Sequence, residues 1–334
     1  MEPQRCHILI VGAGLAGAAT AYHLRVQGVT DVILLEREAV PGVHASGRNA
    51  AMLRERMDHD ALQPLAREST AVLRRGALAD FRATGGFLLG SGTTPLAGVV
   101  ACGRGTGTFH PEDGIIDVAG LLHRYLAGQD VRYGVTFESA RDVGDGLLVE
   151  TSAGPLQARY VVNAAGPWAG PVGTLPLTPR NRHLFVSARD ESIDADWPFI
   201  WDLEHGYYLR PESGGWLLCA CDEADAAPGA YAEDPAVIES LGRKLRRWQP
   251  DLGDLRIARA WVGQRTFAAD GLPAIGFDAE RPRWFHVAGL GGHGVTLSYA
   301  VGRLAAAMLL GSEEGLPALA PARLQAAPTA RVPS

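Results

Sequence analysis

Lysine and cysteine are both scarce in this sequence, which has one lysine, Lys244, and four cysteines among its 334 residues. Four scattered cysteines are too few for a disulfide scaffold, and we interpret Cys219 and Cys221 as two thiols on one face of a strand. The sequence also lacks an uninterrupted run of about 18 apolar residues, so we expect no transmembrane helix. These absences favour a cytoplasmic protein.

An excess of positive charge is missing too. The formal net charge is -6, which gives no reason to expect nucleic acid as a partner. The sequence contains no His-Glu-x-x-His, no paired-cysteine zinc pattern, no phosphate loop ending in Gly-Lys-Ser/Thr and no Gly-x-Ser-x-Gly elbow. No metal site is therefore predicted. Hydrophobic residues make up 47% of the chain, enough for a large core.

The N-terminal segments predict a β-α-β unit. Residues 7–11 form a short apolar run that is typical of a buried parallel strand. A glycine turn at 12–17 is followed by an alanine- and leucine-rich helix over 18–26, and 32–35 reads as a second buried strand. This order of elements implies a parallel sheet with both faces covered.

The next third of the chain changes character. A helix is predicted over 117–126. Apolar and polar residues then alternate over 131–137, 146–151 and 156–162, which indicates a small antiparallel meander.

The last third first departs from the opening pattern and then returns to it. Alternation through 171–268 indicates an antiparallel sheet with one helix near 237–248. A buried strand over 284–288, a glycine loop over 289–294 and a helix over 296–310 follow. The sequence therefore predicts an α/β fold, α+β overall, with a Rossmann-type nucleotide-binding domain and an interleaved antiparallel-sheet substrate domain.

The expected domain boundaries follow from this division. The nucleotide-binding domain is predicted to be discontinuous, and we expect the C-terminal end, rich in alanine and proline, to be a flexible tail. The nucleotide-binding domain comprises 1–75, 109–170 and 269–312, the substrate domain comprises 76–108 and 171–268, and the tail is 313–334.

The turn after the first strand carries the spacing G-x-G-x-x-G. Gly12 allows the sharp turn, Gly14 lets the backbone approach a pyrophosphate, and Gly17 lets the helix pack closely on the strand. The helix N-terminus offers free N–H groups to phosphates. Glu36, at the end of the next strand, is placed to accept hydrogen bonds from ribose hydroxyls. This fingerprint indicates a dinucleotide but does not separate FAD from NAD.

Several further segments resemble the D-amino acid oxidase superfamily, which includes glycine, sarcosine and D-amino acid oxidases. The stretch from His44 to Arg48 has the His-x-x-Gly-Arg pattern of bacterial D-arginine dehydrogenase-type enzymes, to which the likeness is greatest. The resemblance covers most of residues 5–310. The segments that carry it are 36–51, 113–117, 161–168, 206–212, 261–273 and 289–294.

The resemblance implies FAD as the cofactor. The glycine loop before the last helix would face the flavin N1–C2=O edge with backbone N–H groups. No cysteine or histidine stands out as an attachment point, so dissociable FAD is expected. The residues assigned to FAD are Gly12, Gly14, Leu15, Ala16, Gly17, Glu36, Arg37, Ser46, Gly47, Arg48, Asn49, Ala50, Val135, Ala164, Ala165, Gly166, Trp168, Arg265, Gly289, Gly291, Gly292, His293 and Gly294.

Four residues are candidates for the substrate site. Arg265 matches by position the carboxylate-binding arginine of the superfamily, with a structural ion pair as the alternative. Tyr208 matches a substrate-contacting tyrosine, whereas its neighbour Tyr207 is expected on the opposite face of the strand. Arg182 corresponds to an arginine that reaches the substrate in arginine-oxidising relatives, or else is a surface residue. His44 would border the substrate and accept an amine proton, or else is structural.

The implied reaction is hydride transfer from the carbon that bears the nitrogen of a small amino acid, a D-amino acid by the resemblance, to flavin N5. The imino acid formed would hydrolyse to a 2-oxo acid. Two alternatives stay open: a 2-hydroxy acid dehydrogenase of the same superfamily, and a non-catalytic flavin-binding subunit. The electron acceptor would be O2, or a quinone or carrier, and Lys244 is poorly placed to activate O2. The oligomeric state is open.

One departure from the superfamily is the stretch from about 80 to 110, which is shorter than in relatives and rich in glycine and threonine. A residue that covers the substrate side chain in relatives would be missing there. The identity of the substrate is therefore the least determined part of the prediction.

Overall fold

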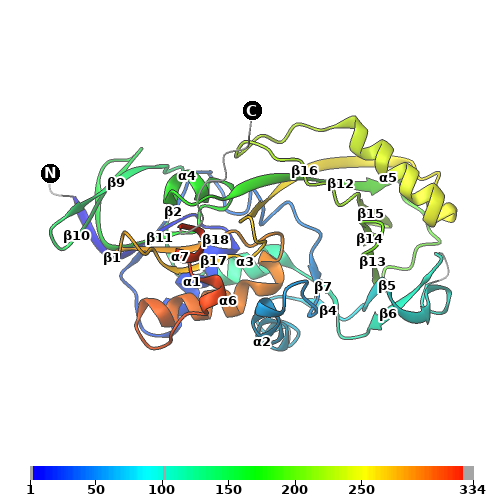
Figure 1. The fold of residues 1–334 in the computed structure, drawn as a ribbon, viewed down its shortest axis with the longest axis horizontal. Coiled ribbons are helices and arrows are strands. Elements are labelled where there is room, and N and C mark those ends of the chain that lie inside the picture. The colour runs from blue at the N-terminus through cyan, green and yellow to red at the C-terminus, as the bar shows by residue number, and fades with distance from the viewer. Residues whose placement is uncertain (1–2, 101–102, 326–334) are drawn as a thin grey trace.

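The computed structural model describes residues 3–100 and 103–325. Figure 1 shows two lobes, one around an eight-stranded sheet and one around a seven-stranded sheet. Strands β12 (Thr178–Ser187) and β16 (Ile257–Phe267) form the upper edge of the second sheet and run toward the first. No helix among the described residues is both long enough and apolar enough to cross a membrane.

The centre of the eight-stranded sheet is parallel. Five strands lie in the order β18, β11, β1, β2, β8, and each neighbouring pair is parallel. Every residue of β2 and β18 is buried, as expected for strands covered on both faces. This arrangement confirms the predicted Rossmann-type half. The bounds are β1 (Gln4–Val11), β2 (Val32–Glu36), β8 (Asp130–Tyr133), β11 (Leu156–Asn163) and β18 (Trp284–Ala288).

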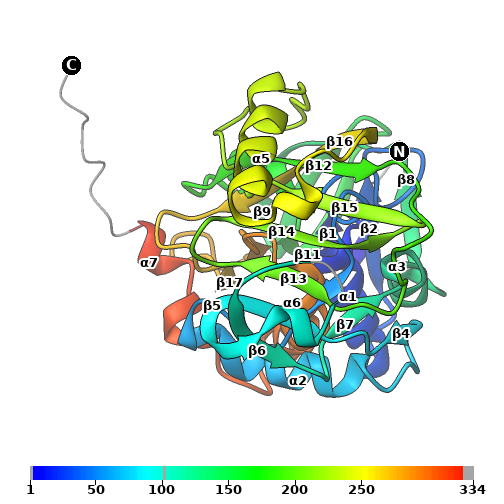
Figure 2. The ribbon, with the colours of Figure 1, turned by 90° about the vertical axis from the view of Figure 1, so that its right-hand side faces the viewer.

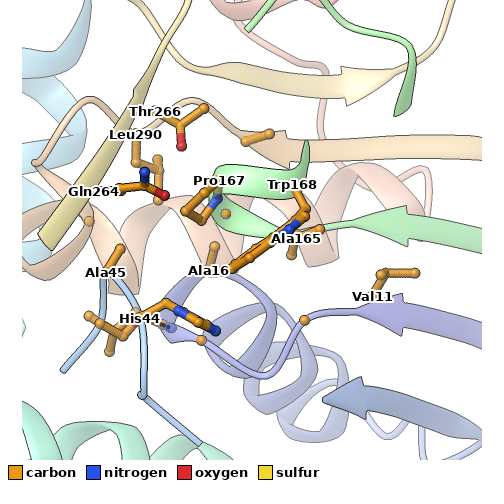
Figure 3. A pocket seen from close by; sticks show the side chains of 18 of the residues that line it. Val11, Ala16, His44, Ala45, Ala165, Pro167, Trp168, Gln264, Thr266 and Leu290 are labelled. Atoms are coloured by element: carbon orange, nitrogen blue, oxygen red, sulfur yellow. Dashed lines mark hydrogen bonds between the residues drawn. The ribbon is translucent and has the colours of Figure 1, made fainter. Parts of the chain in front are cut away.

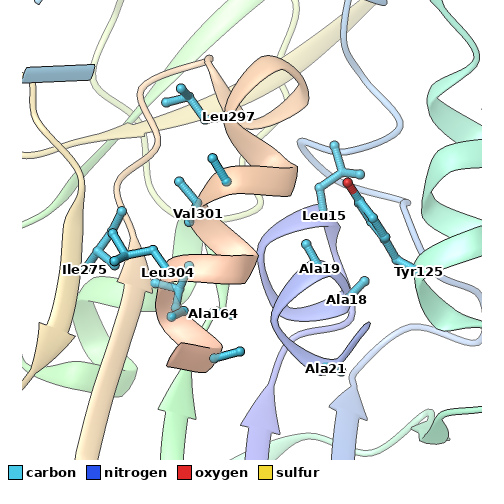
Figure 4. Packing of buried hydrophobic residues seen from close by; sticks show 14 of the residues in the cluster. Leu15, Ala18, Ala19, Ala21, Tyr125, Ala164, Ile275, Leu297, Val301 and Leu304 are labelled. Atoms are coloured by element: carbon cyan, nitrogen blue, oxygen red, sulfur yellow. The ribbon is translucent and has the colours of Figure 1, made fainter. Parts of the chain in front are cut away.

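Two helices of this half pack closely, as Figure 4 shows for α1 and α6. Small residues make the approach possible: Ala18 and Ala19 of α1 are fully buried, and a Cβ on Gly302 of α6 would lie 2.6 Å from the carbonyl carbon of Ala19. Helix α3 begins after Asp117, whose carboxylate accepts a hydrogen bond from the Gly120 N–H. The helices are α1 (Leu15–Val26), α2 (Gln63–Leu73), α3 (Val118–Leu126) and α6 (Gly294–Leu309).

The predicted meander is partly wrong. The stretch 131–137 is not a strand of the meander. Its first residues, 131–133, lie in β8, which follows the crossover helix α3 and therefore pairs in parallel with β2. The antiparallel extension begins one strand later. It consists of β9 (Phe137–Val143) and β10 (Gly146–Thr151), which continue onto β11, while β17 (Ala274–Phe277) pairs antiparallel with β18 at the other edge.

The seven-stranded sheet has the order β16-β12-β15-β14-β13-β5-β6, and all pairs except β13 with β5 are antiparallel. Figure 2 looks onto it with α5 above. This confirms the predicted antiparallel-sheet half. The remaining bounds are β5 (Gly86–Pro95), β6 (Thr106–His110), β13 (Phe199–Asp202), β14 (Tyr207–Glu212), β15 (Gly215–Cys219) and α5 (Pro235–Trp248).

The two faces of this sheet differ. On one face Phe185, Tyr207 and Leu218 form an apolar core with Leu241 and Leu245 of α5. The other face carries Leu184, Tyr208, Cys219 and Trp261, together with Ala50 from the nucleotide-binding half. Because side chains alternate along a strand, each strand contributes to both layers.

Short elements complete the chain. Strands β5 and β6 lie within the stretch from about 80 to 110, and they form one edge of the seven-stranded sheet. The short elements are β3 (Met52–Leu53), β4 (Phe81–Arg82), β7 (Gly114–Ile116), α4 (Ala169–Gly173) and α7 (Ala322–Gln325), with 3-10 turns η1 (Asp60–Leu62), η2 (Leu96–Gly98), η3 (Gly166–Trp168), η4 (Pro250–Leu252) and η5 (Pro317–Leu319).

The sheets draw on different parts of the chain in a way that supports the proposed domain division, which stays a proposal. Part of the expected tail is packed on the body: Leu319 and Leu324 are buried, and Arg323 forms an ion pair with Asp270. Residues 326–334 lie outside the described residues.

Candidate active site

A cavity opens at the carboxyl ends of β1, β2, β11 and β18, where ligands bind in doubly wound sheets. Figure 3 shows it between the turn after β1, the segment around His44, and strand β16, which places Gln264 and Thr266 above it. The cavity therefore lies between the two sheets.

The turn after β1 leaves no room for a Cβ at two of its glycines, Gly12 and Gly17. Gly12 has φ +105°, and a Cβ there would lie 2.4 Å from the carbonyl oxygen of Ala164. A Cβ on Gly17 would lie 2.0 Å from the carbonyl oxygen of Gly12. The first turn of α1 has no side-chain cap from its N-cap residue Gly14, although the Leu15 N–H donates to Ser46 Oγ at 3.0 Å. Backbone and helix dipole thus face the cavity directly.

Glu36 lies where the fingerprint predicts. It ends β2, is 8% exposed and lines the cavity. One carboxylate oxygen accepts from the Ala13 N–H at 3.2 Å and the other from the Glu38 N–H at 3.0 Å. These bonds fix the carboxylate beside the glycine turn, in the position from which a ribose hydroxyl would be bound.

A buried polar network holds the turn that lines the opposite wall. Asn163, which is fully buried, donates to the carbonyl of Ala169 at 2.8 Å and accepts from the Ala165 N–H. Its amide also meets Nδ1 of His286, whose Nε2 lies 3.0 Å from the Asp278 carboxylate. Burial is the main cause of the lowered pKa of His286. The segments that carry the family resemblance include the turn Ala164-Ala165-Gly166. The hydrogen-bond network of Asn163, His286 and Asp278 that holds this turn was not predicted from the sequence.

The loop before α6 is made of left-handed glycines. Gly289, Gly291 and Gly292 have φ of +73°, +57° and +90°, and all three line the cavity. A Cβ on Gly292 would lie 2.5 Å from Nε of Arg265, so loop and arginine are in direct contact.

His293 does not line the cavity. Its Nε2 is 3.9 Å from Asp58, and burial together with the charge of Arg54 lowers its pKa to about 4.

The site fits a dinucleotide on structural grounds. At Gly12 and Gly17 an added Cβ would collide with backbone, and at Gly14 it would lie 2.9 Å from Ser46 Oγ, so the turn leaves its backbone open to a closely approaching phosphate. Glu36 lines the same cavity, and so do the first residues of α1 and α6, whose N-cap residues Gly14 and His293 supply no side-chain cap. FAD would be held by these loops.

Arg265 lines the cavity from β16. One of its terminal nitrogens donates to the Tyr208 hydroxyl at 3.3 Å. Tyr208 is 1% exposed and does not line the cavity, so it supports Arg265 from behind. Burial, with the neighbouring Cys219 thiol, raises the pKa of Tyr208. As predicted, Tyr207 lies on the other face, where its hydroxyl accepts from Gln249.

Arg182 is buried beside this pair and does not line the cavity. It is ion-paired with Glu223, and its Nε has no hydrogen-bond partner among the described residues. Its predicted contact with substrate stays a prediction. Cys219 and Cys221 pack in the same cluster as Tyr208, and the Cys221 N–H donates to the Cys219 sulfur at 3.3 Å. Three free cysteines are described: Cys6, Cys219 and Cys221.

His44 lines the cavity, but both of its ring nitrogens have partners. Nε2 lies 2.9 Å from the Glu38 carboxylate, and Nδ1 lies 2.6 Å from the Tyr231 hydroxyl. Because a carboxylate only accepts, Nε2 carries the proton, and a neutral imidazole then accepts from Tyr231 at Nδ1. His44 cannot take an amine proton without giving up one of these bonds.

Most of the predicted FAD residues line this cavity. Four do not, each for a packing reason. Gly17 packs against Gly12, Gly47 against Gly42, Ala50 lies in the core with Tyr208, and His293 turns toward Asp58.

Sequence analysis missed several lining residues, because most are apolar or small residues to which neither the dinucleotide fingerprint nor the resemblance gave an individual role. Gln264 and Thr266 could have been found as neighbours of Arg265 on the same strand. The missed residues are Val11, Leu35, Gly42, Val43, Ala45, Thr136, Phe137, Pro167, Val172, Gln264, Thr266, Val287, Ala288, Leu290 and Val295.

The chain is similar in sequence to two bacterial glycine oxidases. The chain is 30% identical over 174 residues to the glycine oxidase of Bacillus subtilis, covering 51% of this chain and 46% of that enzyme. It is 24% identical over 363 residues to the glycine oxidase of Bacillus licheniformis, covering 92% of this chain and 94% of that enzyme.

Solved structures share the fold. The L-proline dehydrogenase of P. horikoshii superposes with a TM-score of 0.86 at 19% identity, covering 97% of this chain and 99% of that one. The glycine oxidase of Geobacillus kaustophilus gives a TM-score of 0.81 at 22% identity, covering 95% and 98%. Residues 7–101 and 93–308 match the DAO family, described as FAD dependent oxidoreductase. The chain therefore belongs to the DAO family of FAD-dependent oxidoreductases.

Proposed function

We propose that this enzyme oxidises the carbon–nitrogen bond of a small amino acid, with a D-amino acid as the expected substrate. Arg265 carries the proposal, because it is a guanidinium that lines the cavity where the glycine loop meets strand β16. A guanidinium fork binds a carboxylate through two charge-assisted hydrogen bonds. The similar proteins include glycine oxidases and an L-proline dehydrogenase, which supports an amino acid as the substrate class.

The residues of the chain orient the substrate. Arg265 holds the carboxylate, and Tyr208 fixes the orientation of Arg265 from behind. FAD, when bound, supplies the acceptor for the hydride of the carbon that bears the nitrogen. The resulting imino acid is hydrolysed by water to a 2-oxo acid and ammonia.

The electrons leave to O2, or to a quinone or a carrier. Lys244, the single lysine, donates to the carbonyls of Gly206 and Ala220 and does not line the cavity. This placement favours an acceptor other than O2.

The test is anaerobic bleaching of the flavin band by D- and L-amino acids, glycine, sarcosine and 2-hydroxy acids in turn. Bleaching by an amino acid supports the proposal, and bleaching by 2-hydroxy acids alone would replace it with the hydroxy acid reading. A holoenzyme that no compound bleaches would favour a non-catalytic subunit. Admitting air after bleaching separates an oxidase from a dehydrogenase.

Arg265→Met sharpens this test. We expect kcat/KM to fall about 100-fold, roughly 2.7 kcal/mol, because the substrate carboxylate loses its charged partner. Arg259→Met is the matched control, since Arg259 is exposed on the same strand. Equal activity of the two variants would remove Arg265 from the site.

A further inference from the structure

The segment 222–234, which links β15 to α5, lies against the cavity-lining residues His44 and Gln264 and is called the strap here. It is fastened to its own sheet by polar contacts. His183 accepts a hydrogen bond from the Asp234 N–H at 2.9 Å and meets Asp222 at 2.7 Å. The Gln264 side chain donates to the carbonyl of Ala227 and accepts from the Gly229 N–H, both at 2.8 Å. The strap is therefore part of the substrate-binding half.

Tyr231 reaches from the strap to the other half. Its ring stacks on His44 with centroids 5.7 Å apart and 19° between planes, and the Arg48 guanidinium lies 4.2 Å above it. Its hydroxyl lies 2.6 Å from His44 Nδ1. Both His44 and Arg48 line the cavity, so Tyr231 joins the strap to the cavity wall, as does Gly229, where a Cβ would lie 3.0 Å from the Trp168 ring.

Tyr231 contacts a segment of the nucleotide-binding half that has no regular secondary structure. Residues 41–49 form turns with neither helix nor strand. Arg48 donates to the carbonyl of Val262 on β16, which is a second bond between the halves. His44 also meets the Trp168 ring edge-on, with centroids 4.6 Å apart, and the Arg37 guanidinium lies 4.3 Å from the centroid of the same indole.

The chain of hydrogen bonds fixes the imidazole at both ends. Glu38 accepts from Nε2–H, which leaves Nδ1 as the acceptor for the Tyr231 hydroxyl. Burial raises the pKa of Tyr231 to about 12, and the nearby charge of Arg48 opposes the rise, so its hydroxyl keeps its proton at neutral pH.

We propose that Tyr231 is a positioning residue: its hydroxyl, acting with Glu38, fixes His44 at the cavity rim and clasps the strap to the nucleotide-binding half. The clasp keeps His44, Trp168 and the strap in register, and its loss loosens the rim without removing any group that binds the substrate carboxylate. Its kinetic consequence rests on the proposed function, whereas its structural consequence does not.

The structural test uses the holoenzyme and a glutamate-specific protease. Glu233 is exposed within the strap, two residues beyond Tyr231, and cleavage after it is followed by mass spectrometry. Tyr231→Phe keeps the ring against Arg48 and removes only the hydroxyl. We expect cleavage at Glu233 to be five- to tenfold faster than in the wild-type protein, at an unchanged melting temperature. Tyr160→Phe, which alters a ring packed against His7 and Phe277, is expected to cleave at the wild-type rate.

The kinetic test separates positioning from catalysis. In Tyr231→Phe we expect KM for the amino acid to rise five- to tenfold, with kcat within twofold of wild type. His44→Gln combined with Tyr231→Phe is expected to add nothing to the larger single effect on KM or cleavage, because both break one chain.

Two results would overturn the clasp: equal cleavage rates in wild type and Tyr231→Phe, or additive effects in the double variant. A wild-type enzyme that oxidises no amino acid would defeat the proposed function alone, since the cleavage rates still decide about Tyr231.

Discussion

At the glycine turn after β1 the eight-stranded half meets the cavity with backbone, whereas the seven-stranded sheet meets it with the side chains of β16. On the first side, a Cβ on Gly12 would lie within 2.4 Å of a backbone carbonyl oxygen, and one on Gly17 within 2.0 Å. On the second side, Gln264 and Arg265 line the cavity from one strand, and Tyr208 accepts a hydrogen bond from Arg265. The two walls of one cavity are thus built from different material.

This difference determines which wall of the cavity tolerates amino-acid substitution. Backbone that approaches a ligand closely leaves no room for an added methyl group, so the wall at the glycine turn admits little variation. A wall of side chains on a regular sheet can exchange one residue for another while the strands keep their register. The same fold can therefore keep its cofactor while its substrate differs.

Gly17→Ala is the most severe way to probe the backbone wall, because Gly17 packs behind Gly12, which lines the cavity. The added Cβ would meet the carbonyl oxygen of Gly12 and also lie 3.0 Å from Ile10, so the turn must open. We expect a loss of about 3 kcal/mol in the free energy of unfolding and at least a tenfold weaker affinity for FAD. Urea unfolding and the flavin absorbance after purification measure the two effects.

The matched control lies in the other half. In Gly242→Ala the nearest atom to the new Cβ is the flexible Arg246 guanidinium at 3.3 Å, and Gly242 lies inside α5. Alanine favours a helix over glycine by up to about 1 kcal/mol, so this variant should be slightly more stable. If both variants behaved alike, the contrast between the two walls would fail.

The backbone wall is also the part that the sequence predicted well. The spacing of the glycines, the apolar strand before them and Glu36 form a local sequence pattern. The loop 289–294 has a similar pattern, because it is a glycine-rich segment between a buried strand and α6. Local patterns of this kind survive folding, because the residues involved are neighbours in the chain. The β-α-β unit and the antiparallel half follow from the same periodicities.

The side-chain wall was predicted less completely. The Tyr231–His44 contact joins residues 187 positions apart, and the pairing of Arg182 with Glu223 depends on where the strap folds back. No periodicity encodes such contacts. The same limit explains β8, whose alternating residues suggested a meander although the preceding helix carries it into the parallel sheet. Which residues face a cavity is a tertiary property.

Low pH is expected to have a smaller effect, and it acts on the free energy of unfolding through a buried histidine of the nucleotide-binding half. His23 of α1 is 4% exposed, its ring packs edge-on against Tyr299 of α6, and its Nε2 has no hydrogen-bond partner among the described residues. Burial, helped by the charge of Arg303, lowers its pKa to about 4. Its ordinary pKa is near 6.5, so between pH 6.5 and 4 the unfolded chain binds a proton that the folded one refuses. Folding stability from this residue is therefore lost as pH falls, by about 2 kcal/mol down to pH 5.

His23→Leu should remove this loss and flatten the acid limb of the stability curve by about 2 kcal/mol. Urea unfolding at pH 8 and at pH 5 measures it, with FAD saturating in both. His123→Leu, an exposed residue of α3, is the control and should leave the curve unchanged. An unchanged acid limb in His23→Leu would show that the helix interface of the nucleotide-binding half does not sense pH.

The smallest expected effects are those of removing the hydroxyls of Tyr207 and Tyr208, which lie on opposite faces of strand β14. Tyr208→Phe removes the hydroxyl that accepts from Arg265, and Tyr207→Phe removes the one that accepts from Gln249 at 3.1 Å beneath α5. Each hydrogen bond is worth about 1 kcal/mol. Tyr208→Phe should therefore raise KM about fivefold with nearly unchanged stability, since Arg265 lies at the cavity and loses its brace. Tyr207→Phe should lower the free energy of unfolding by about 1 kcal/mol and leave KM alone. Steady-state kinetics and urea unfolding of both variants decide the matter, and the same response from both would mean that the sheet does not separate a binding face from a structural one.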